Sequence, residues 1–413
     1  MRKNRVWGRL LGLGAARVVE VDLEAGILVV RAELKRRSGA RCGVCGRLSP
    51  GYDGSRGWRR WRTLDLGSSR TYVEAEVARV RCSEHGVVTE RVPWAVQGSR
   101  FARWFEEQVA WLAMECSKSA VAELMRIGWR TVGHILERVA RRLLRPRRQL
   151  AGLCRIGIDE ISFRKGYRFL TVVVDHVSGR LVWAAEGADV ATLTRFFEQL
   201  GKRGCLRIRQ VSADGANWIA TVVRRHCPQA HLALDPFHVV KWATEAVDKV
   251  RRELWAGARR SGDASHARLL QRSRWVLWRN SEDLSERQQL KLASIEQVNQ
   301  PLFRAHLLKE HLRLIFQLPY KDAVGLLHNW LQWARQSEIE PFVRLADTIA
   351  TYYLDALLVT LEHRLSNALV EAVNTRIRLI TRRAFGFHSA KPLIALAMFS
   401  LGGYRPRLPG RPV

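Results

Sequence analysis

Three acidic residues occupy positions at which a carboxylate is expected to do chemistry. Asp159 interrupts an apolar run at 155–161, where a charge is costly unless it is paired or binds a metal ion. Asp214 ends another apolar stretch, and Glu371 lies in the early turns of a predicted helix. Carboxylate oxygens are preferred ligands of Mg²⁺ and Mn²⁺, and two such ions can activate a water or a 3′-hydroxyl and stabilise the leaving oxygen. The alternative is that the three belong to ordinary salt bridges among the 39 acidic residues.

Polar residues near these carboxylates are candidates for accessory roles. Asn374 and Arg378 follow Glu371 at i+3 and i+7, so they share its helical face and could reach a phosphate. An Arg-rich helix end also suits the C-terminal helix dipole, which is the alternative. His238, three residues after Asp235, could orient a scissile phosphate or donate a proton, but a capping or core role is equally consistent with its position.

Two close pairs of residues have the spacing of metal-binding knuckles. Cys42 and Cys45 form the first pair, and Cys82 and His85 form the second. Two residues between ligands let one tight turn aim both at a single ion, and a Cys₃His set suits one structural Zn²⁺ with no open coordination position. The other four cysteines are scattered singly, which makes this clustering stand out, although four unrelated residues remain the alternative.

The stretch 119–143 has the pattern of a helix, a turn at Gly128 and a second helix. A recognition helix in the major groove of DNA needs a basic, polar face. An ordinary helical hairpin with a solvated charged face is the alternative. The candidate DNA-binding residues are Arg126, Arg130, Arg138, Arg141 and Arg142.

Composition narrows the class of protein. With 413 residues, 47% of them hydrophobic, the chain has material for several cores, which excludes wholesale disorder. The net charge of +30 indicates a polyanionic partner, most simply nucleic acid; a ribosomal-type RNA binder and a membrane-surface protein are the alternatives. Half of that excess lies in the first 150 residues, with 30 Lys and Arg against 15 Asp and Glu. No uncharged window of about 18 residues predicts a membrane span, and seven cysteines in a long chain favour a reducing cytoplasm.

The elements that would position these residues change character along the chain. Residues 1–40 have a β pattern, with a hairpin turn at 24–26, and an alternating strand is predicted at 71–82. Helical spacing follows at 101–144. From 155 to 234 short apolar segments predict the order β-β-β-α-β-α-β, with strands buried on both faces. Only helical patterns occur from 237 to about 363, and a last helix is predicted at about 368–383.

Taken together, these blocks resemble the ISL-three family of insertion-sequence transposases. The Cys42–Cys45 pair with Thr63–Leu66 is similar to the family's zinc-finger domain. Residues 158–168 resemble its first catalytic block, and 211–214 with 235–241 its second. Residues 366–378 with 383–386 resemble its third. His85 departs from the family, which commonly has another Cys at longer spacing there, as do Ala368 and Ala372, where Gly is frequent.

The resemblance implies a multidomain α+β protein with an RNase-H-like α/β catalytic core interrupted by an all-α insertion. It implies that Asp159, Asp214 and Glu371 form a DDE catalytic triad holding two Mg²⁺ or Mn²⁺ ions. The implied activity is cleavage of DNA at the element's terminal inverted repeats and strand transfer into target DNA. A homodimer on DNA, a nucleoid-associated cytoplasmic location and no membrane partner are expected with it.

The expected domains follow from the same blocks. The chain is divided into a zinc-binding domain at 1–100, a helix-turn-helix region with a basic linker at 101–150, a first core part at 151–236, a helical insertion at 237–365, the last core helix at 366–400 and a basic tail at 401–413. The N-terminal 150 residues are expected to recognise the element's ends, and the insertion to add non-specific affinity.

Two other functions stay open at this point. One is a catalytically silent DNA-binding regulator of transposase descent, which loss of any one of the three carboxylates would favour. The other is a related nuclease that cuts branched DNA or RNA, against which the N-terminal modules argue. All three carboxylates are present, so the active transposase is the preferred interpretation.

Overall fold

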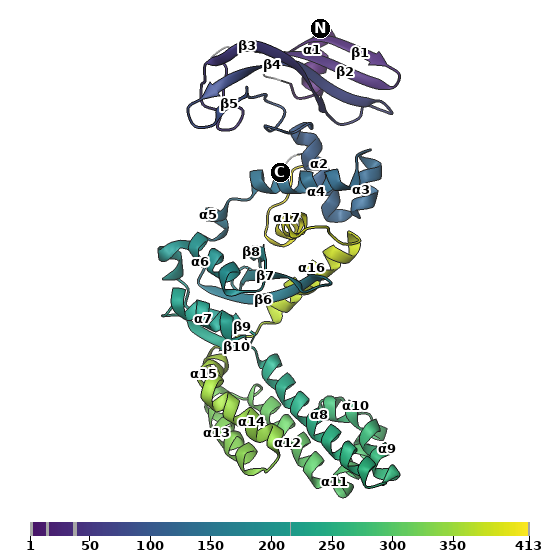
Figure 1. The fold of residues 1–413 in the computed structure, drawn as a ribbon, viewed down its shortest axis with the longest axis vertical. Helices are drawn as coiled ribbons and strands as arrows, with labels where there is room; N and C mark the ends of the chain where they lie inside the picture. Colours follow the sequence, from purple (N-terminus) through teal and green to yellow (C-terminus); the bar gives the residue numbers. More distant parts are fainter. Residues whose placement is uncertain (1–2, 14–15, 36–38, 215, 412–413) are drawn as a thin grey trace. The chain divides into compact units, whose positions relative to one another are not determined.

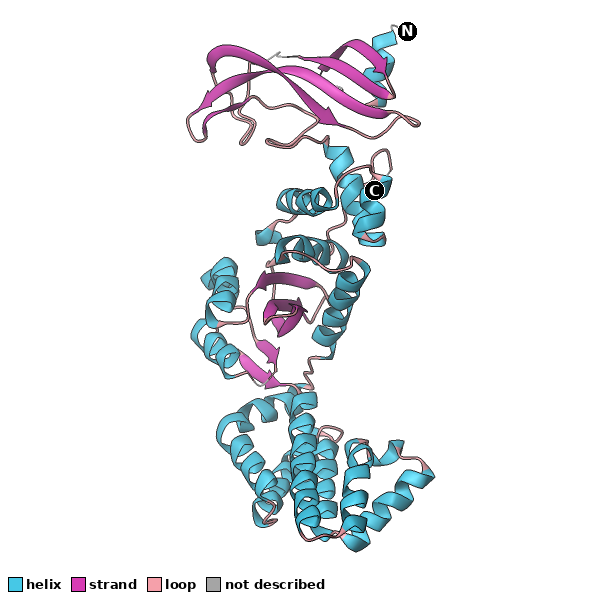
Figure 2. Ribbon diagram, turned by 45° about the vertical axis from the view of Figure 1, so that its right-hand side comes forward, coloured by secondary structure: helices cyan, strands magenta, loops and turns pink. Residues whose placement is uncertain are grey.

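The computed structural model describes residues 3–13, 16–35, 39–214 and 216–411. The chain forms two compact units. The first comprises Met1–Arg145 and Leu379–Val413, and the second comprises Pro146–Arg378. Figure 1 labels the elements and Figure 2 distinguishes helices from strands. Each unit is described by itself.

The first unit begins with a five-stranded sheet. Its strands are β1 (Ala16–Glu24), β2 (Ile27–Leu34), β3 (Gly51–Arg62), β4 (Arg70–Cys82) and β5 (Gly86–Thr89). The order is β1-β2-β4-β3, with β5 antiparallel to β4. The predicted turn joins β1 to β2 through Ala25 and Gly26, both at positive φ, and the alternating strand is β4. β3 was not predicted, because its segment is rich in Gly and Arg.

The β pattern expected throughout residues 1–40 was wrong at its start. The first strand begins only at Ala16, and Lys3–Leu10 before it forms a helix, α1. Its residue Trp7, with Leu11 after it, packs against the apolar face of the sheet. These two side chains therefore add to the core of the sheet without extending the sheet itself, because a helix can bury a few large side chains on one stripe.

Helices complete the first unit. They are α2 (Arg103–Glu115), α3 (Lys118–Leu124), α4 (Trp129–Leu143) and α17 (Ala390–Leu401). The predicted helix, turn and helix are α3 and α4, and Gly128 is the N-cap residue of α4. α17 packs against α4 and α2, so residues expected in the last core helix at 366–400 belong partly to this unit. No separate helix was predicted there.

The second unit contains the predicted α/β core. Its strands are β6 (Arg155–Arg164), β7 (Arg168–Asp175), β8 (Leu181–Glu186), β9 (Gln210–Ala213) and β10 (His231–Leu234). Its helices are α5 (Pro146–Gln149), α6 (Val190–Cys205), α7 (Asn217–His226) and, up to Arg378, α16 (Ala368–Arg383). The order is β10-β9-β6-β7-β8, with β6, β9 and β10 parallel and β7 and β8 antiparallel. The predicted element order is confirmed, and this strand order is that of the RNase-H-like core. The basic linker contains the short α5.

The late helix α16 lies close against β6. A Cβ atom on Gly157 would come within 2.3 Å of Val370 Cγ2, which leaves no room for any side chain. Val370 is fully buried. Ala368 and Ala372 do not interrupt the helix, which runs without a break from Ala368 to Arg383. Gly157 therefore sets how near α16, with Glu371 on it, approaches the central strand.

The insertion is wholly helical, as predicted. It contains α8 (Pro236–Arg260), α9 (Ala264–Arg272), α10 (Arg274–Trp278), α11 (Glu286–Val298), α12 (Gln300–Ile315), α13 (Tyr320–Gln336), α14 (Glu340–Thr348), a π-helical segment (Ile349–Tyr353) and α15 (Leu354–His363), with a 3₁₀ turn at Ser281–Asp283. These helices share one apolar core that includes Trp330 and Phe342. In Figure 1, α8 leads from β10 into this bundle and α15 returns to the same strand.

Candidate active site and metal centre

The strand pairing brings Asp159 and Asp214 to the same sheet edge. β6 and β9 are parallel neighbours, and Ile158 pairs with Ala213. Each aspartate is the next residue after a member of that pair. The two carboxylates come from segments 55 positions apart in the sequence and lie at the carboxyl end of the short strand β9, the kind of position at which sites gather in open α/β sheets.

Asp159 is held in a defined orientation and is difficult to ionise. Its Oδ1 accepts a hydrogen bond from the backbone N–H of Glu160 at 2.7 Å, and its Oδ2 accepts one from Asn374 Nδ2 at 2.7 Å. Burial raises the pKa of Asp159 to about 6, and the nearby charges of Asp214 and Glu371 act in the same direction. Asn374, for which an accessory role is expected, thus contacts Asp159 directly.

Glu160 is a further candidate site residue, which the sequence analysis did not name. Burial raises the pKa of Glu160 to about 7, with the charges of Asp214 and Asp159 adding to the effect. Glu160 Oε1 and Asp214 Oδ1 are both buried, and neither has a hydrogen-bond partner in the described part of the chain. Buried carboxylate oxygens without a donor are costly, so this pair fits a bound cation. No sequence signal indicated Glu160, because neighbouring residues of a strand are expected on opposite faces of the sheet.

Glu371 and Arg378 lie on the solvent side of α16. Both are exposed, whereas Asn374 between them is buried. Glu371 acts on Asp159 through its charge. Among the described residues, the three carboxylates do not form a cluster as tight as the Cys and His group of the first unit. The exposed carboxylate of Glu371 is therefore accessible from solvent.

Asp235 joins the insertion to the core. Its Oδ1 accepts hydrogen bonds from the backbone N–H groups of Phe237 and Asn367, both at 3.4 Å, so it caps α8 and holds the segment before α16. His238 Nδ1 lies 3.3 Å from Asp235 Oδ2. That hydrogen bond raises the pKa of His238, and the charge of Asp214 adds to it. His238 is therefore both part of the cap region and near the carboxylates.

A buried polar chain fixes the approach to α16. Ser212 Oγ donates a hydrogen bond to Asn367 Oδ1 at 2.5 Å and lies 2.7 Å from His176 Nε2. Because the single hydroxyl hydrogen goes to Asn367, the hydrogen of the second bond belongs to His176 Nε2. The side chain of Asn367 thus binds β9, while its backbone oxygen accepts a hydrogen bond from Glu371 N.

The four predicted zinc ligands converge. Cys45 Sγ lies 3.7 Å from Cys82 Sγ, and His85 Nδ1 lies 3.7 Å from Cys82 Sγ and 4.0 Å from Cys42 Sγ. All four ligand atoms lie within 4.8 Å of one another. A tetrahedron with ligand bonds of about 2.3 Å has edges of roughly 3.8 Å, so the spacing fits zinc. Hydrogen bonding, first from the backbone at Glu84 and then from His85, lowers the pKa of Cys82 to about 6.

Each knuckle is closed by a glycine in the left-handed region. Gly46 follows the first pair with φ 76°, and Gly86 follows the second with φ 65°. Such values are readily adopted only by glycine. The repeated order of two ligands followed by Gly was a further sequence signal for this site, and it supports treating His85 as the fourth ligand.

The helix-turn-helix arginines divide into two groups. Arg138 Nε lies 2.7 Å from Glu106 Oε1, a carboxylate that is fully buried, and Arg142 lies 3.5 Å from the same group. Arg142 also lies 2.9 Å from Glu107. These two arginines neutralise acids on α2, and an unpaired buried charge would be costly. Their contacts are structural.

The other predicted arginines are more accessible. Arg126, at positive φ, pairs with Asp65 at 3.2 Å and donates to Ser68 O at 3.0 Å. Arg130 and Arg141 are exposed on α4, and neither forms an ion pair within the described residues. They are eleven positions apart, about three helical turns, so they lie on one face. That face therefore carries two exposed arginines without a carboxylate partner among the described residues.

Comparison with known families gives three matches in the expected order. Residues 38–85 match a family described as the zinc-finger of transposase IS204/IS1001/IS1096/IS1165. Residues 90–140 match the helix-turn-helix domain of transposase family ISL3. Residues 156–397 match the ISL3 family described as Transposase, a match that covers more than half of the chain.

Full-length relatives agree. The chain is 46% identical over 438 aligned residues to the transposase for insertion sequence element IS1557 of Mycobacterium tuberculosis, an alignment that covers 100% of this chain and 98% of the relative. It is 30% identical over 332 residues to the transposase for insertion sequence element IS1001 of Bordetella parapertussis, covering 80% and 81%. Among the described residues, no helix is long and apolar enough to cross a membrane.

Proposed function

The chain belongs to the ISL3 family of insertion-sequence transposases, and from that premise we propose that Asp159, Asp214 and Glu371 are its catalytic residues. The observation that carries the proposal is the pairing of β6 with β9, which puts two acidic residues from distant segments at one edge. α16 packs on the same strand and carries Glu371. Glu160 is adjacent, and a bound cation would favour its ionised form against the burial that raises its pKa.

The three carboxylates would hold two Mg²⁺ or Mn²⁺ ions. When bound, such ions supply an activated water or 3′-hydroxyl and stabilise the leaving oxygen. The chain's own residues orient and tune the site. Asn374 holds one oxygen of Asp159 in place, and the backbone N–H of Glu160 holds the other. His238, kept protonated more readily by Asp235, would contact a phosphate near the carboxylates.

The remaining parts would serve recognition. The Cys42, Cys45, Cys82 and His85 group would hold one structural zinc ion that fixes the end of β4. Arg130 and Arg141 would contact the terminal inverted repeats, with Arg126 near the turn, whereas Arg138 and Arg142 support α4 from within. A homodimer on DNA, bound to the ends and to target DNA in the nucleoid, would bring two such sites together.

Cleavage of a terminal-repeat duplex by single variants tests the catalytic assignment. Asp159→Asn, Asp214→Asn and Glu371→Gln keep side-chain shape while removing charge. Residues that act as a unit are not additive, so each variant should lose cleavage by about 10³-fold or more while still binding DNA. Glu362→Gln, an exposed acid on α15, is the matched control and should cut normally. A folded, DNA-binding variant that cuts near the normal rate would remove its residue from the site.

A further inference from the structure

The outer end of the helical insertion carries an unusual concentration of unpaired positive charge. The segment 254–281 contains six arginines and one acidic residue. All six arginines are exposed: Arg259, Arg260, Arg268, Arg272, Arg274 and Arg279. Within the described residues none of them forms an ion pair with a carboxylate, whereas Arg251 and Arg252, just before the segment, both pair with Asp248. Self-repulsion makes such a cluster unfavourable without a polyanion.

Aromatic side chains are interleaved with these arginines. Arg259 lies over the ring of Trp255, 5.2 Å from its centroid, and Arg274 lies 4.2 Å from the centroid of Trp278. Trp275 contacts Trp278 edge to face and is 64% exposed. A large exposed indole beside a stacked guanidinium holds that guanidinium in a fixed orientation, so less side-chain freedom is lost when it binds a phosphate.

The same segment is hollowed. Trp255, Arg259, Arg268 and Gln271 line a depression of about 490 Å³ between the end of α8 and α9. Its polar lining consists of positive groups and an amide, with no acid among its residues. These donors suit phosphate oxygens. The charge, the aromatic stacks and the depression define what is here called the Arg–Trp surface: Trp255, Arg259, Arg268, Gln271, Arg274, Trp275 and Trp278.

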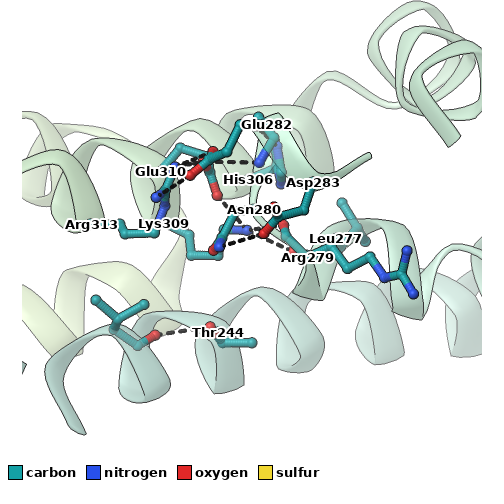
Figure 3. A network of polar contacts seen from close by, with 12 residues as sticks. Thr244, Leu277, Arg279, Asn280, Glu282, Asp283, His306, Lys309, Glu310 and Arg313 are labelled. Carbon is teal, nitrogen blue, oxygen red and sulfur yellow. Dashed lines mark hydrogen bonds and ion pairs between the residues drawn. The ribbon is translucent and has the colours of Figure 1, made fainter. Parts of the chain in front are cut away.

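A buried ionic network supports this surface from behind. Figure 3 shows Lys309 of α12 directed at the end of α10, where its Nζ donates to the backbone oxygens of Leu277 and Arg279, both at 2.9 Å. These are among the carbonyls that a helix end leaves unsatisfied. Glu310, 2.6 Å from Lys309, and Arg313 complete the network. Lys309 is 99% buried, so its role is to fix α10 rather than to meet a ligand.

The length of α8 relates the Arg–Trp surface to the carboxylates. The helix starts one residue after Asp235, beside His238, and ends at Arg260. Twenty-five residues at about 1.5 Å each span roughly 37 Å. One turn of B-DNA is about 34–36 Å. A duplex whose phosphate lies at the carboxylates and that follows α8 would therefore present its backbone to the Arg–Trp surface one helical turn away.

We propose that the Arg–Trp surface at the outer end of the insertion binds the backbone of duplex DNA about one helical turn from the cleaved phosphate. This inference rests on the proposed function for the position of that phosphate. The contact is sequence-independent, because guanidinium groups read the phosphate backbone and not base edges. It makes cleavage depend on the length of flanking duplex.

The test uses the full chain and compares two double variants that remove equal charge. Arg268→Gln/Arg274→Gln alters the Arg–Trp surface. Arg335→Gln/Arg344→Gln, on α13 and α14, removes two exposed arginines that already pair with Asp347 and Glu340. Binding is measured against salt concentration with terminal-repeat duplexes that extend, on each side of the cleavage point in turn, about half a turn or about two turns.

On the long duplex, the Arg268→Gln/Arg274→Gln variant should bind about 10–100-fold more weakly, and its slope of log affinity against log salt should be shallower by about 2. On the short duplex it should match the wild type, and the control variant should match it on both. Trp275→Ala should weaken long-duplex binding several-fold, and its effect should largely vanish in the Arg274→Gln background, since both act through one guanidinium.

Equal slopes for the wild type and the Arg268→Gln/Arg274→Gln variant on every long duplex would overturn the proposal. So would an equal loss on short and long duplexes, or loss of self-association in place of DNA binding, which would identify a second copy of the chain as the occupant. If the wild type fails to cut the terminal repeat, the proposed function fails, while the length-dependent binding difference still decides this inference.

Discussion

Buried carboxylates that lack donors make the metal-free site costly. Asp159 and Glu160 both have raised pKa values, and Asp214 keeps a buried oxygen without a hydrogen-bond partner in the described chain. A folded-state pKa above the unfolded value means that the folded protein holds its proton more tightly. The resulting stability is present below the unfolded pKa and is lost as pH rises through the folded one.

We therefore expect Asp159→Asn to stabilise the metal-free protein in a pH-dependent way. Above about pH 6 the variant should be more stable than the wild type by about 1–3 kcal/mol, because it avoids ionising a buried carboxyl. Near pH 4 the difference should disappear, since the folded wild type is then protonated. Thermal unfolding in a chelator from pH 4 to 8 measures this. A difference that does not change with pH would exclude the ionisation mechanism.

The zinc ligands give a second prediction at this scale. Cys42 is fully buried and converges with three other ligands, so Cys42→Ser should lose most of the bound metal and destabilise the first unit. Cys116→Ser, which changes an exposed cysteine outside the group, should keep about one zinc per chain. Elemental analysis of both purified proteins measures the difference. Full metal content in Cys42→Ser would contradict the assignment.

Much of the candidate site could be predicted from residue types, but not all of it. Asp159 and the two knuckles could be predicted because a charge inside an apolar run and closely spaced Cys pairs have few other uses. Glu160 could not, because alternation along a strand sends adjacent side chains to opposite faces. The ion pairs of Arg138 and Arg142 could not be predicted either, since their partner Glu106 lies on another helix.

At the scale of elements, the approach of α16 to β6 depends on one glycine. Gly157→Ala would place a methyl group against Val370, so α16 must shift. We expect a destabilisation of about 1–3 kcal/mol and a large loss of cleavage, because Glu371 moves with the helix. The second-site change Val370→Ala should recover part of the activity, because it removes the nearest contact while His176 Nε2 at 2.9 Å and Ser212 Oγ at 3.1 Å must still give way.

Gly257 provides the matched control for this prediction. It lies within α8 with no other side chain or distant backbone atom within 4 Å of an added Cβ. Gly257→Ala should stabilise the protein by about 0.5–1 kcal/mol, because alanine loses less backbone freedom in a helix. Denaturant unfolding and terminal-repeat cleavage distinguish the two. Normal cleavage by Gly157→Ala would mean that the helix is not positioned through this contact.

The order of the elements along the chain was easier to predict than the elements against which each one packs. Short apolar runs separated by helical spacing predicted β-β-β-α-β-α-β correctly, since burial on both faces leaves a recognisable pattern. α1 was missed because its segment is short and has three basic residues among few apolar ones. α17 was missed because an apolar run alone does not distinguish a strand from a buried helix. The surfaces against which α1 and α17 pack are set by the tertiary fold and not by the sequence of either segment.

At the scale of the whole molecule, the chain leaves the first unit at Arg145 and returns to it from Leu379. The helix-turn-helix region and the C-terminal segment therefore belong to one compact unit, although the core and the insertion separate them in sequence. The domains expected from the sequence could not show this, because each of them groups only residues that are continuous along the chain. The expected boundary at 400 cuts through α17, which ends at Leu401.

Because α17 packs on α4 and α2, we expect it to determine the stability of the helix-turn-helix region. Leu393 is fully buried in the helix that packs on α4 and α2. Leu393→Ala should cost about 2–5 kcal/mol through lost burial and the cavity left behind. Limited proteolysis should then cut first within residues 103–143, and terminal-repeat binding should weaken, while the core around Asp159 stays protected. Lys391→Ala, exposed on the same helix, should change stability by less than about 0.5 kcal/mol. If Leu393→Ala instead opened the core first, α17 would have to be counted with the catalytic unit.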